Sequence, residues 1–339
     1  MTRARTATAG PGLVVGVIGA GAMARTHLPA WLALGARVTV LSARDGAAVL
    51  ADRYRAEGVT VARDLDDLLH RSTVIDVCTP TPEHRPLALA AIRAGRSVVC
   101  EKPLALTGAD AAEIARAAEE AGVLLFPAHV VRYFPAYAAL AGAVARGELG
   151  PPSALRFTRS GAHPGRASWF ADPASSGGVL MDFMIHDMDC ARWVAGEVVR
   201  VRAGVRSRPP GAGGTPLVQG AAVLTHASGA VSRVYGTWGR GDLPFRTTFR
   251  VTGPGGVREH DSAAGGQPAP GPADGPYLAQ LRDFTTALAG GPPPRVSPGD
   301  GVAAVRIAAA AVLSSRTGES VDLVDGHPVA RGGGVRPTG

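Results

Sequence analysis

Asparagine is absent from this chain of 339 residues, and lysine occurs once, at Lys102. The other 34 basic residues are arginine, so arginine serves wherever positive charge alone is required. A lysine that persists in this background indicates a position that needs a compact ammonium with an adjustable pKa, which a planar and permanently charged guanidinium does not provide. Lys102 is therefore the first candidate for a chemical role, and survival by chance is the alternative.

Cysteine is also scarce, with Cys78, Cys100 and Cys190 scattered along the chain. Three isolated cysteines form neither a disulfide framework nor a C-x-x-C metal site. The histidines show no metal-ligand spacing either, so we expect no metal. No apolar run approaches the about 20 residues that span a bilayer, and residues 1–12 contain no apolar segment of a secretory signal. These absences predict a cytoplasmic protein with no membrane partner.

The net charge of +7 does not point to nucleic acid. The arginines are spread along the chain, and no basic block alternates with aromatic residues, as a nucleic-acid surface would require. An anionic small ligand accounts for the mild basicity equally well. The length exceeds one typical domain and predicts two.

The first third of the chain alternates apolar strands with amphipathic helices. This alternation predicts an α/β domain in which helices wrap a parallel sheet. The expected strands are 13–18, 37–41, 73–78, 97–100 and 123–126, and the expected helices are 22–34, 46–57, 83–94 and 108–121.

From about residue 129 the pattern changes to that of an α+β domain with an open, mostly antiparallel sheet. A helix is expected over 135–146, strands over 198–206, 217–225 and 230–238, and a hairpin turn at Ser228-Gly229. The predicted organisation is a disordered tail (1–12), an α/β domain (13–128), an α+β domain (129–326) and a flexible tail (327–339).

Gly19-Ala20-Gly21-Ala22-Met23-Ala24 follows the first expected strand and opens the first helix. This G-x-G-x-x-A pattern is typical of dinucleotide binding. Gly19 permits a tight turn, Gly21 lets the backbone approach a pyrophosphate, and Ala24 allows helix and strand to pack closely. The helix N-terminus then faces the phosphate charge.

The end of the second strand favours NADP over NAD. An acidic residue about 20 positions after the glycines binds the ribose 2′-hydroxyl of NAD, whereas small residues beside an arginine accommodate the 2′-phosphate of NADP. Here Ser42 or Ala43 occupies the expected acid position and Arg44 follows. Asp45 keeps NAD open as the alternative, because a shift of one residue in the turn would bring it to the ribose.

Asp182 and His186 are spaced i, i+4 in a helix-like segment, so they are expected on one face. Oxidation of an alcohol carbon requires the hydroxyl proton to leave, and histidine accepts protons near neutral pH. Lys102 would donate to the same oxygen and stabilise its alkoxide character. Asp182 would hold the substrate hydroxyl or orient His186. An isolated Asp-x-x-x-His pair is also compatible with an ordinary polar helix face.

Nearly the whole chain resembles the glucose-fructose oxidoreductase and inositol dehydrogenase family (Gfo/Idh/MocA). Thr81 and His129 depart from the pattern, because asparagine is common there in relatives. The matching segments are Gly19–Ala24, Thr79–His84, Ala94–Pro103, Ser176–Asp182 continuing to Ile185–Asp189, and Ser314–Gly318 followed by Val321.

The resemblance implies a Rossmann domain, an α+β domain with an open sheet that often forms an oligomer interface, and a nicotinamide cofactor that meets a sugar or cyclitol between the domains. A homodimer or homotetramer is expected. The implied enzyme is an NAD(P)-dependent oxidoreductase that acts on a CH–OH group of a sugar, sugar derivative or cyclitol. The alternatives are an NAD-dependent glycosidase of similar fold and a non-catalytic sensor.

Weaker candidates adjoin these motifs. Arg132 is a candidate substrate ligand, and the alternative is a surface charge. Trp169 and Phe170 either form a wall of the substrate pocket or belong to the core. His84 either lies beside the cofactor or is a helix residue without a chemical role. The motifs and the resemblance together predict Lys102, Asp182 and His186 as catalytic, Gly19, Gly21, Ala22, Met23, Ser42, Arg44, Thr79, Pro80, His84, Glu101 and Lys102 as cofactor-binding, and Lys102, Arg132, Trp169, Asp182 and His186 as substrate-binding.

Overall fold

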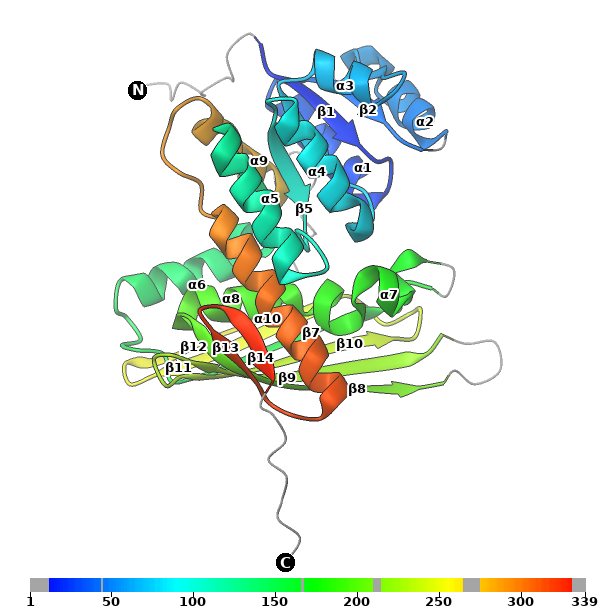
Figure 1. The fold of residues 1–339 in the computed structure, drawn as a ribbon. Coiled ribbons are helices and arrows are strands. Elements are labelled where there is room, and N and C mark those ends of the chain that lie inside the picture. The colour runs from blue at the N-terminus through cyan, green and yellow to red at the C-terminus, as the bar shows by residue number, and fades with distance from the viewer. Residues whose placement is uncertain (1–11, 44, 166–167, 210–214, 265–274, 331–339) are drawn as a thin grey trace, which may run out of the picture. The chain divides into compact units, whose positions relative to one another are not determined.

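A computed structural model describes residues 12–43, 45–165, 168–209, 215–264 and 275–330 (Figure 1). Arg44, the expected N-terminal tail up to residue 11 and residues 331–339 lie outside the described residues. The chain divides into two compact units. The first comprises Met1–Ala105, Ala109–Pro135 and Gln267–Val302, and the second comprises Leu106–Gly108, Ala136–Gly266 and Ala303–Gly339, as far as these ranges are described.

The first unit contains the predicted parallel sheet. Its six strands lie in the order β3-β2-β1-β4-β5-β6, and every pair is parallel. The central strands are buried on both faces, which explains their mostly apolar sequences. The strands are β1 (Val14–Ile18), β2 (Arg37–Leu41), β3 (Thr60–Val61), β4 (Val74–Val77), β5 (Ser97–Glu101) and β6 (Leu125–Ala128).

Helices follow most of these strands, as the alternation predicts. The helix expected over 46–57 ends early, because a short 3₁₀ turn at Arg55–Glu57 replaces its last part and Gly58 then adopts a left-handed conformation. The helices are α1 (Ala22–Ala33), α2 (Gly46–Arg53), α3 (Leu65–Arg71), α4 (His84–Arg93) and α5 (Gly108–Ala121), with 3₁₀ turns at Thr81–Glu83 and Val130–Tyr133.

A late segment of the chain completes the core of the first unit. Helix α9 (Pro276–Leu288) packs against α1, and its Leu278, Leu281 and Phe284 join the same apolar cluster as Trp31. The rings of Phe284 and Phe126 stack with centroids 4.7 Å apart. The expected single boundary after residue 128 therefore does not hold for the described residues 275–302, which belong to the first unit.

The second unit contains an eight-stranded sheet in the order β12-β11-β7-β10-β9-β8-β13-β14. Within the described part of this second sheet, only the β10–β7 pair is parallel, so the mostly antiparallel sheet is confirmed. The strands are β7 (Ala154–Ala162), β8 (Val198–Arg208), β9 (Leu217–His226), β10 (Val231–Gly239), β11 (Arg246–Gly253), β12 (Gly256–Asp261), β13 (Val321–Val324) and β14 (His327–Ala330).

The flexible tail predicted from residue 327 is wrong at its start. His327–Ala330 forms β14, which pairs with β13 across a tight turn. Asp325 and Gly326 at this turn both have positive φ, which fits the preference of two-residue hairpin loops for such conformations. The hairpin predicted at Ser228-Gly229 is confirmed between β9 and β10, where Gly229 has φ +84°.

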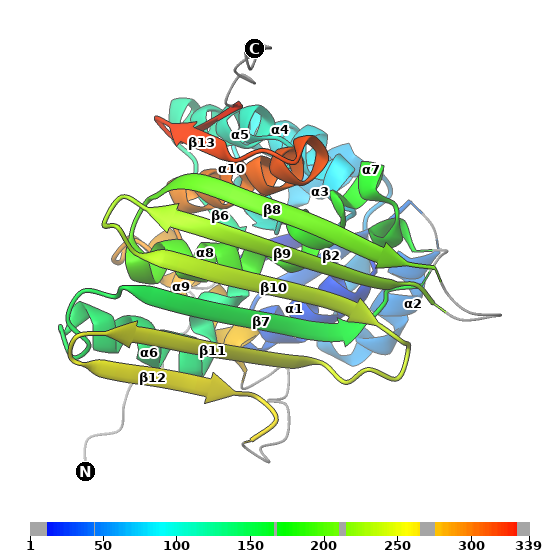
Figure 2. The ribbon, with the colours of Figure 1, turned by 90° about the horizontal axis from the view of Figure 1, so that it is seen from below.

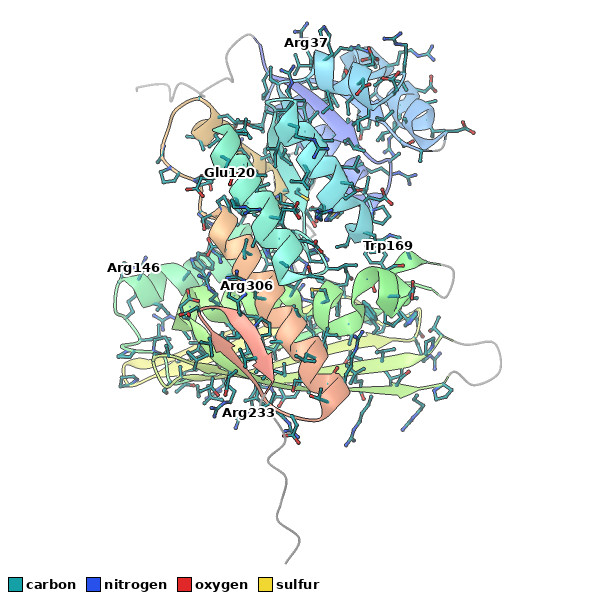
Figure 3. All side chains as sticks on the ribbon, viewed as in Figure 1. Arg37, Glu120, Arg146, Trp169, Arg233 and Arg306 are labelled. Atoms are coloured by element: carbon teal, nitrogen blue, oxygen red, sulfur yellow. The ribbon has the colours of Figure 1, made fainter. Side chains whose placement is uncertain are left out.

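One face of the eight-stranded sheet carries helices of its unit. Helix α8 (Ile185–Ala195) contacts β7 and β10. Figure 2 looks onto the opposite face, which no described helix covers. Arg233, labelled in Figure 3, points away from the sheet on this open face. The remaining helices are α6 (Pro135–Ala145), α7 (Pro173–Ser176) and α10 (Pro298–Thr317), with a 3₁₀ turn at Trp169–Ala171. Within the described ranges, every helix falls short of the length and apolarity needed to cross a bilayer.

Candidate active site

The loop between β1 and α1 has the geometry that the glycine pattern predicts. Gly19 has φ +116°, and a Cβ at this position would lie 2.6 Å from the carbonyl oxygen of Cys78. Only glycine fits there. Gly21 begins α1 with no side-chain cap, a Cβ there would meet no atom within 4 Å, and the first turn contains no acidic residue. The open backbone and uncapped N–H groups fit a pyrophosphate.

The strand order places this loop at the switch point of the sheet. β1 lies between β2 and β4, so the chain runs outward in one direction through β2 and β3 and in the other through β4, β5 and β6. Ligands of open α/β sheets bind outside the carboxyl ends of the strands at such a point. The residues that follow those ends include Gly19, Ser42, Thr79 and Lys102.

Ser42, directly after β2, presents a hydroxyl where NAD-binding sheets place an acid. Its Oγ accepts a hydrogen bond of 2.9 Å from the backbone N–H of Ala47 in α2. A Cβ at Gly46 would lie 2.9 Å from the Cβ of Ala20, so α2 begins close to the glycine loop. Asp45 caps α2 without a side-chain hydrogen bond.

His84 is fully buried at the start of α4, and its ring faces backbone carbonyls. Its Nδ1 lies 2.8 Å from the carbonyl oxygen of Pro103, and its Nε2 lies 2.9 Å from that of Thr79. Burial lowers the pKa of His84, although the two carbonyls favour the protonated ring. The ring thus links the segment after β4 to the segment after β5. Among the described residues, the buried hydroxyl of Thr79 has no hydrogen-bond partner, which fits a polar ligand at this edge.

Lys102 follows β5 and is partly exposed. Its backbone N–H donates a hydrogen bond of 3.0 Å to Oε2 of Glu101. The other oxygen of Glu101, Oε1, forms an ion pair of 3.2 Å with Nε2 of His27. Nδ1 of His27 lies 2.9 Å from Oδ2 of Asp76. The predicted catalytic lysine therefore adjoins a buried group of charged side chains.

Sequence reasoning missed His27 and Asp76. Asp76 is a single carboxylate inside the apolar strand Val74–Val77, and it is completely buried. A buried carboxylate is rare unless it is paired, so this break in an apolar run was a usable signal. His27 lies eight residues after Gly19 and is also completely buried. Its partners are distant in sequence, so spacing alone does not reveal them.

In the second unit, Asp182 and His186 flank a change of helix type. Asp182 lies in a π turn, Val179–Phe183, and is 6% exposed, whereas His186 lies in the first turn of α8 and is partly exposed. The helix-like segment predicted for this pair therefore combines a π turn with the start of an α-helix, and the shared face of the two side chains stays a prediction. The two glycines before the π turn have positive φ, +72° at Gly177 and +69° at Gly178, which explains why glycine occurs twice there.

Two contacts hold the His186 segment in place. Met184 packs where β9 and β10 carry glycine, and a Cβ at Gly220 or Gly236 would come within 2.5 or 2.4 Å of the Met184 side chain. Asp187 forms a buried, two-pronged ion pair with Arg159 of β7, with distances of 2.9 and 3.0 Å. A bidentate pair fixes orientation as well as distance.

The weaker candidates are placed as follows. Arg132 is 2% exposed, so the surface-charge interpretation is wrong. Its guanidinium lies 3.2 Å from Oδ1 of Asp300 and donates a 3.3 Å hydrogen bond to the carbonyl oxygen of Arg295. Trp169 and Phe170 stack on each other at 4.0 Å and are both partly exposed. Substrate binding by Arg132 and Trp169 stays a prediction.

Comparison with protein families gives two matches. The N-terminal segment of residues 13–129 matches the oxidoreductase family with an NAD-binding Rossmann fold (GFO_IDH_MocA). Residues 137–257 match the GFO/IDH/MocA C-terminal domain.

Curated relatives extend over most of the chain. A 1,5-anhydro-D-fructose reductase of Ensifer adhaerens is 31% identical over 334 residues, covering 92% of this chain and 98% of the relative. An inositol 2-dehydrogenase of Saccharopolyspora erythraea is 30% identical and covers 91% of this chain and 96% of the relative.

Solved structures agree with the fold. GenD2 from gentamicin A biosynthesis, in complex with NAD, has a TM-score of 0.81 and 28% identity, with coverage of 92% of this chain and 96% of that one. Levoglucosan dehydrogenase in complex with NADH and L-sorbose has a TM-score of 0.79 over 92% of this chain and 99% of that one. At 23% identity the second match supports the fold alone.

Proposed function

Because the chain belongs to the Gfo/Idh/MocA family of oxidoreductases, we propose that it transfers a hydride between a nicotinamide dinucleotide and a secondary alcohol or ketone of a sugar, sugar derivative or cyclitol. The observation that carries this proposal is the position of Lys102. The chain's one lysine directly follows β5 at the carboxyl edge of the parallel sheet, the edge that also carries the glycine loop.

Lys102 is assigned the role of donor to the reacting oxygen. When the alcohol is oxidised, negative charge develops on that oxygen as the C–H bond breaks, and a fixed ammonium stabilises the charge. The bound nicotinamide supplies the hydride acceptor. In the direction of ketone reduction the same ammonium polarises the carbonyl.

His186 is assigned the role of base that accepts the hydroxyl proton, and Asp182 that of substrate ligand or orienting residue. The buried Arg159–Asp187 pair and the packing of Met184 support this assignment, because they restrain the backbone on both sides of His186. A base that is held in position contributes more to the rate than a mobile one, because the geometry of proton transfer is strict.

NADP is proposed as the preferred cofactor, with NAD as the alternative. The support is the Ser42 hydroxyl at the end of β2, where an acid would select NAD, together with Arg44 two residues later in the sequence. The cofactor contacts are assigned to Gly19, Gly21, Ala22, Met23, Ser42, Arg44, Thr79, Pro80, His84, Glu101 and Lys102. His84 is assigned an indirect role, because its ring contacts the backbone carbonyls of Thr79 and Pro103 and so positions the segments that carry them.

The substrate class rests on the relatives, which are named as reductases or dehydrogenases of 1,5-anhydro-D-fructose, D-apiose and inositol. A homodimer or homotetramer formed through the open face of the eight-stranded sheet is proposed as the assembly. Val199 and Val223 are each 39% exposed on neighbouring strands β8 and β9, which supports partial burial by a second copy.

The test is a screen of polyols, sugars and keto-sugars with NAD(H) and NADP(H), followed by absorbance of the reduced nicotinamide. Stoichiometric production of reduced cofactor from one alcohol is the expected result. Product formation without net cofactor turnover would instead identify a glycosidase. Cofactor or sugar binding without any product in either assay would identify a sensor.

A further inference from the structure

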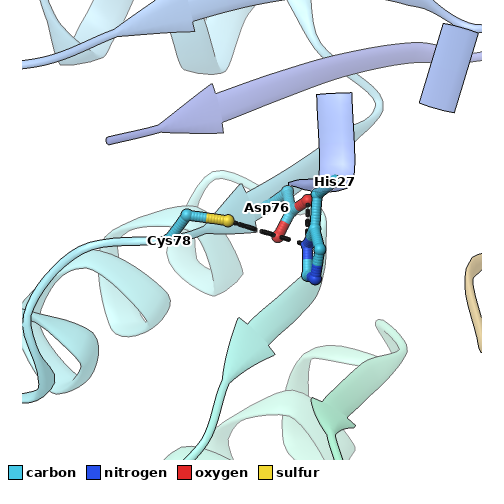
Figure 4. A group of neighbouring side chains, drawn as sticks. All are labelled: His27, Asp76 and Cys78. Atoms are coloured by element: carbon cyan, nitrogen blue, oxygen red, sulfur yellow. Dashed lines mark hydrogen bonds and ion pairs between the residues drawn. The ribbon is translucent and has the colours of Figure 1, made fainter. Parts of the chain in front are cut away.

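Five side chains of the first unit form a polar cluster inside its apolar core. His27 of α1 lies 2.9 Å from Asp76 of β4, and Nε1 of Trp31 donates a 2.7 Å hydrogen bond to the same carboxylate oxygen. The Cys78 thiol donates to the other oxygen of Asp76 at 3.4 Å (Figure 4). Glu101 lies on the far side of the His27 ring, 3.2 Å from its Nε2. His27, Trp31 and Asp76 are completely buried.

The positions of the two carboxylates decide the charge of His27. Nδ1 forms a hydrogen bond with Asp76, whereas Nε2 lies at ion-pair distance from Glu101 without hydrogen-bond geometry. A positive charge on the ring would lie between these two carboxylates, and an opposite charge at this distance favours the protonated form. Burial alone lowers the pKa of His27, but the Asp76 carboxylate and the Cys78 sulfur reverse this effect and leave the pKa well above its ordinary value. The Tyr277 ring, at 5.9 Å, adds no charge to this environment.

The cluster continues to the catalytic candidate through one carboxylate. Oε1 of Glu101 lies 3.2 Å from Nε2 of His27 in an ion pair without a hydrogen bond, and Oε2 accepts a hydrogen bond from the backbone N–H of Lys102. Because the two oxygens belong to one planar group, a movement of Oε1 also moves Oε2. The peptide that begins Lys102 is thus held by a side chain whose own orientation depends on His27.

We propose that protonated His27 is a positioning residue for Lys102, held by Asp76 and acting through Glu101. The proposal rests on the proposed function for its effect on turnover, but the link between His27 and Lys102 is testable without any substrate. The consequence for chemistry is large, since a displacement of about 1 Å at a reacting group can cost on the order of a hundredfold in rate.

A metal site is the competing interpretation, because His27, Asp76 and Cys78 place three potential ligand atoms within 4.8 Å of one another. The hydrogen bonds within the cluster argue against it. The Asp76 oxygens already receive hydrogen bonds from Trp31, His27 and Cys78.

The test compares His27→Gln with His27→Asn. Both variants are neutral, and each keeps one side-chain amide donor. The terminal amide of glutamine reaches about as far as Nε2, toward Glu101, whereas that of asparagine reaches about as far as Nδ1, toward Asp76. Both should lose stability, but only glutamine should preserve the restraint on Glu101. His226→Asn in the second unit is the matched control, because His226 is equally buried and its ring lies 2.7 Å from the Gly196 carbonyl and 2.8 Å from the Ser232 hydroxyl.

The single lysine provides a readout that needs no substrate. Reductive ¹³C-methylation of the full chain labels only Lys102 and the N-terminal amine, so NMR follows the Lys102 environment and titration directly. We expect the Lys102 resonance to move in His27→Asn, to stay near its parent position in His27→Gln, and to be unchanged in His226→Asn. Single-turnover hydride transfer on unlabelled protein should fall about 10- to 100-fold in His27→Asn and about threefold or less in His27→Gln, with cofactor affinity retained in both.

Equal Lys102 spectra in the parent and His27→Asn would overturn the proposal, as would a change of the same size in His226→Asn. If the His27 variants do not fold, Asp76→Asn tests the same link. An unchanged Lys102 resonance in that variant would also overturn the proposal. An equimolar metal in the purified protein, removed by chelation and lost in Cys78→Ala, would replace the proposal with a metal site. If the parent protein shows no hydride transfer in any assay, the proposed function is contradicted, but the His27–Lys102 link is not.

Discussion

Gly220 of β9 and Gly236 of β10 are register partners, and the space left by their missing side chains is filled by Met184. Met184 separates the π turn that carries Asp182 from the helix that carries His186. The two glycines therefore control how closely the segment with the proposed catalytic residues approaches its sheet, although glycine itself has no side chain.

Gly236→Ala tests this relationship. Its Cβ would lie 2.4 Å from Cγ of Met184, so we expect Met184 to shift, stability to fall by about 1–3 kcal/mol, and turnover to fall more than cofactor affinity. Gly204→Ala on β8 is the control, because a Cβ there would meet no atom within 4 Å. Urea unfolding and single-turnover rates measure the two effects. Equal behaviour of both variants would contradict this account.

Lys102→Arg and Lys102→Met should both fold and bind cofactor but lose at least about a hundredfold in turnover. Arginine retains the charge, but its bulkier planar group does not place a single donor on the reacting oxygen. Methionine removes the donor altogether. The measurement is cofactor affinity beside single-turnover hydride transfer. Near-normal turnover in Lys102→Arg would mean that only the charge matters.

His186→Ala should lower turnover to a comparable extent and flatten the rise in rate through neutral pH. The base must be neutral to accept the hydroxyl proton, so removal of the imidazole removes this dependence. The pH profile of kcat between pH 5 and 9 gives the answer. A profile that keeps its neutral limb in the variant would assign the base to another residue.

Cofactor choice should depend on Ser42 and Arg44. Ser42→Asp is expected to shift preference toward NADH, since a carboxylate accepts from the ribose 2′-hydroxyl and repels a 2′-phosphate. Arg44→Ala should weaken NADPH selectively. Fluorescence titration of both reduced cofactors against the parent and both variants decides this. A parent that binds NADH more tightly, or equal losses for both cofactors, would contradict the NADP preference.

Two buried histidines should give the stability opposite pH dependences. Burial lowers the pKa of His226 below 6.5 in the folded protein, so unfolding takes up a proton and stability falls as pH drops below 6.5. The pKa of His27 is raised, so its contribution is complete below pH 6.5 and is lost as pH rises toward the folded-state pKa, by at most about 1.4 kcal/mol per pH unit. Urea unfolding from pH 5 to 9 should show a weaker acid loss in His226→Gln and a weaker alkaline loss in His27→Gln.

Most strands of the first unit were predictable because their sequence signals are local. Apolar runs bounded by glycine predicted β2 over residues 37–41 without error, and the other central strands within one or two residues. β3 was missed because it contains only Thr60 and Val61, too few residues for a periodic pattern. β7 and β11 were also missed, because their polar outward residues, many of them arginine or threonine, reduce the apolar signal.

The candidate site was predictable where residues are adjacent in sequence and not where they meet through folding. The glycine loop and the Glu101-Lys102-Pro103 segment are contiguous motifs. By contrast, His27 and Asp76 are 49 positions apart, and neither strand nor helix periodicity reports such a contact. The change from a π turn to an α-helix between Asp182 and His186 was not predicted, because a spacing of four residues is compatible with either type of helix.

The position of α9 in the chain has a consequence for biosynthesis. Leu281 and Phe284 close the apolar core around Trp31 and Phe126, but they leave the ribosome only after most strands of the second unit have been made. During synthesis, the part of the nascent nucleotide-binding unit that α9 covers therefore stays exposed until more than half of the remaining chain has been made. Premature termination before residue 276 would release a polypeptide whose two aromatic core residues face water, which makes it a substrate for chaperones and proteases rather than a functional half-enzyme.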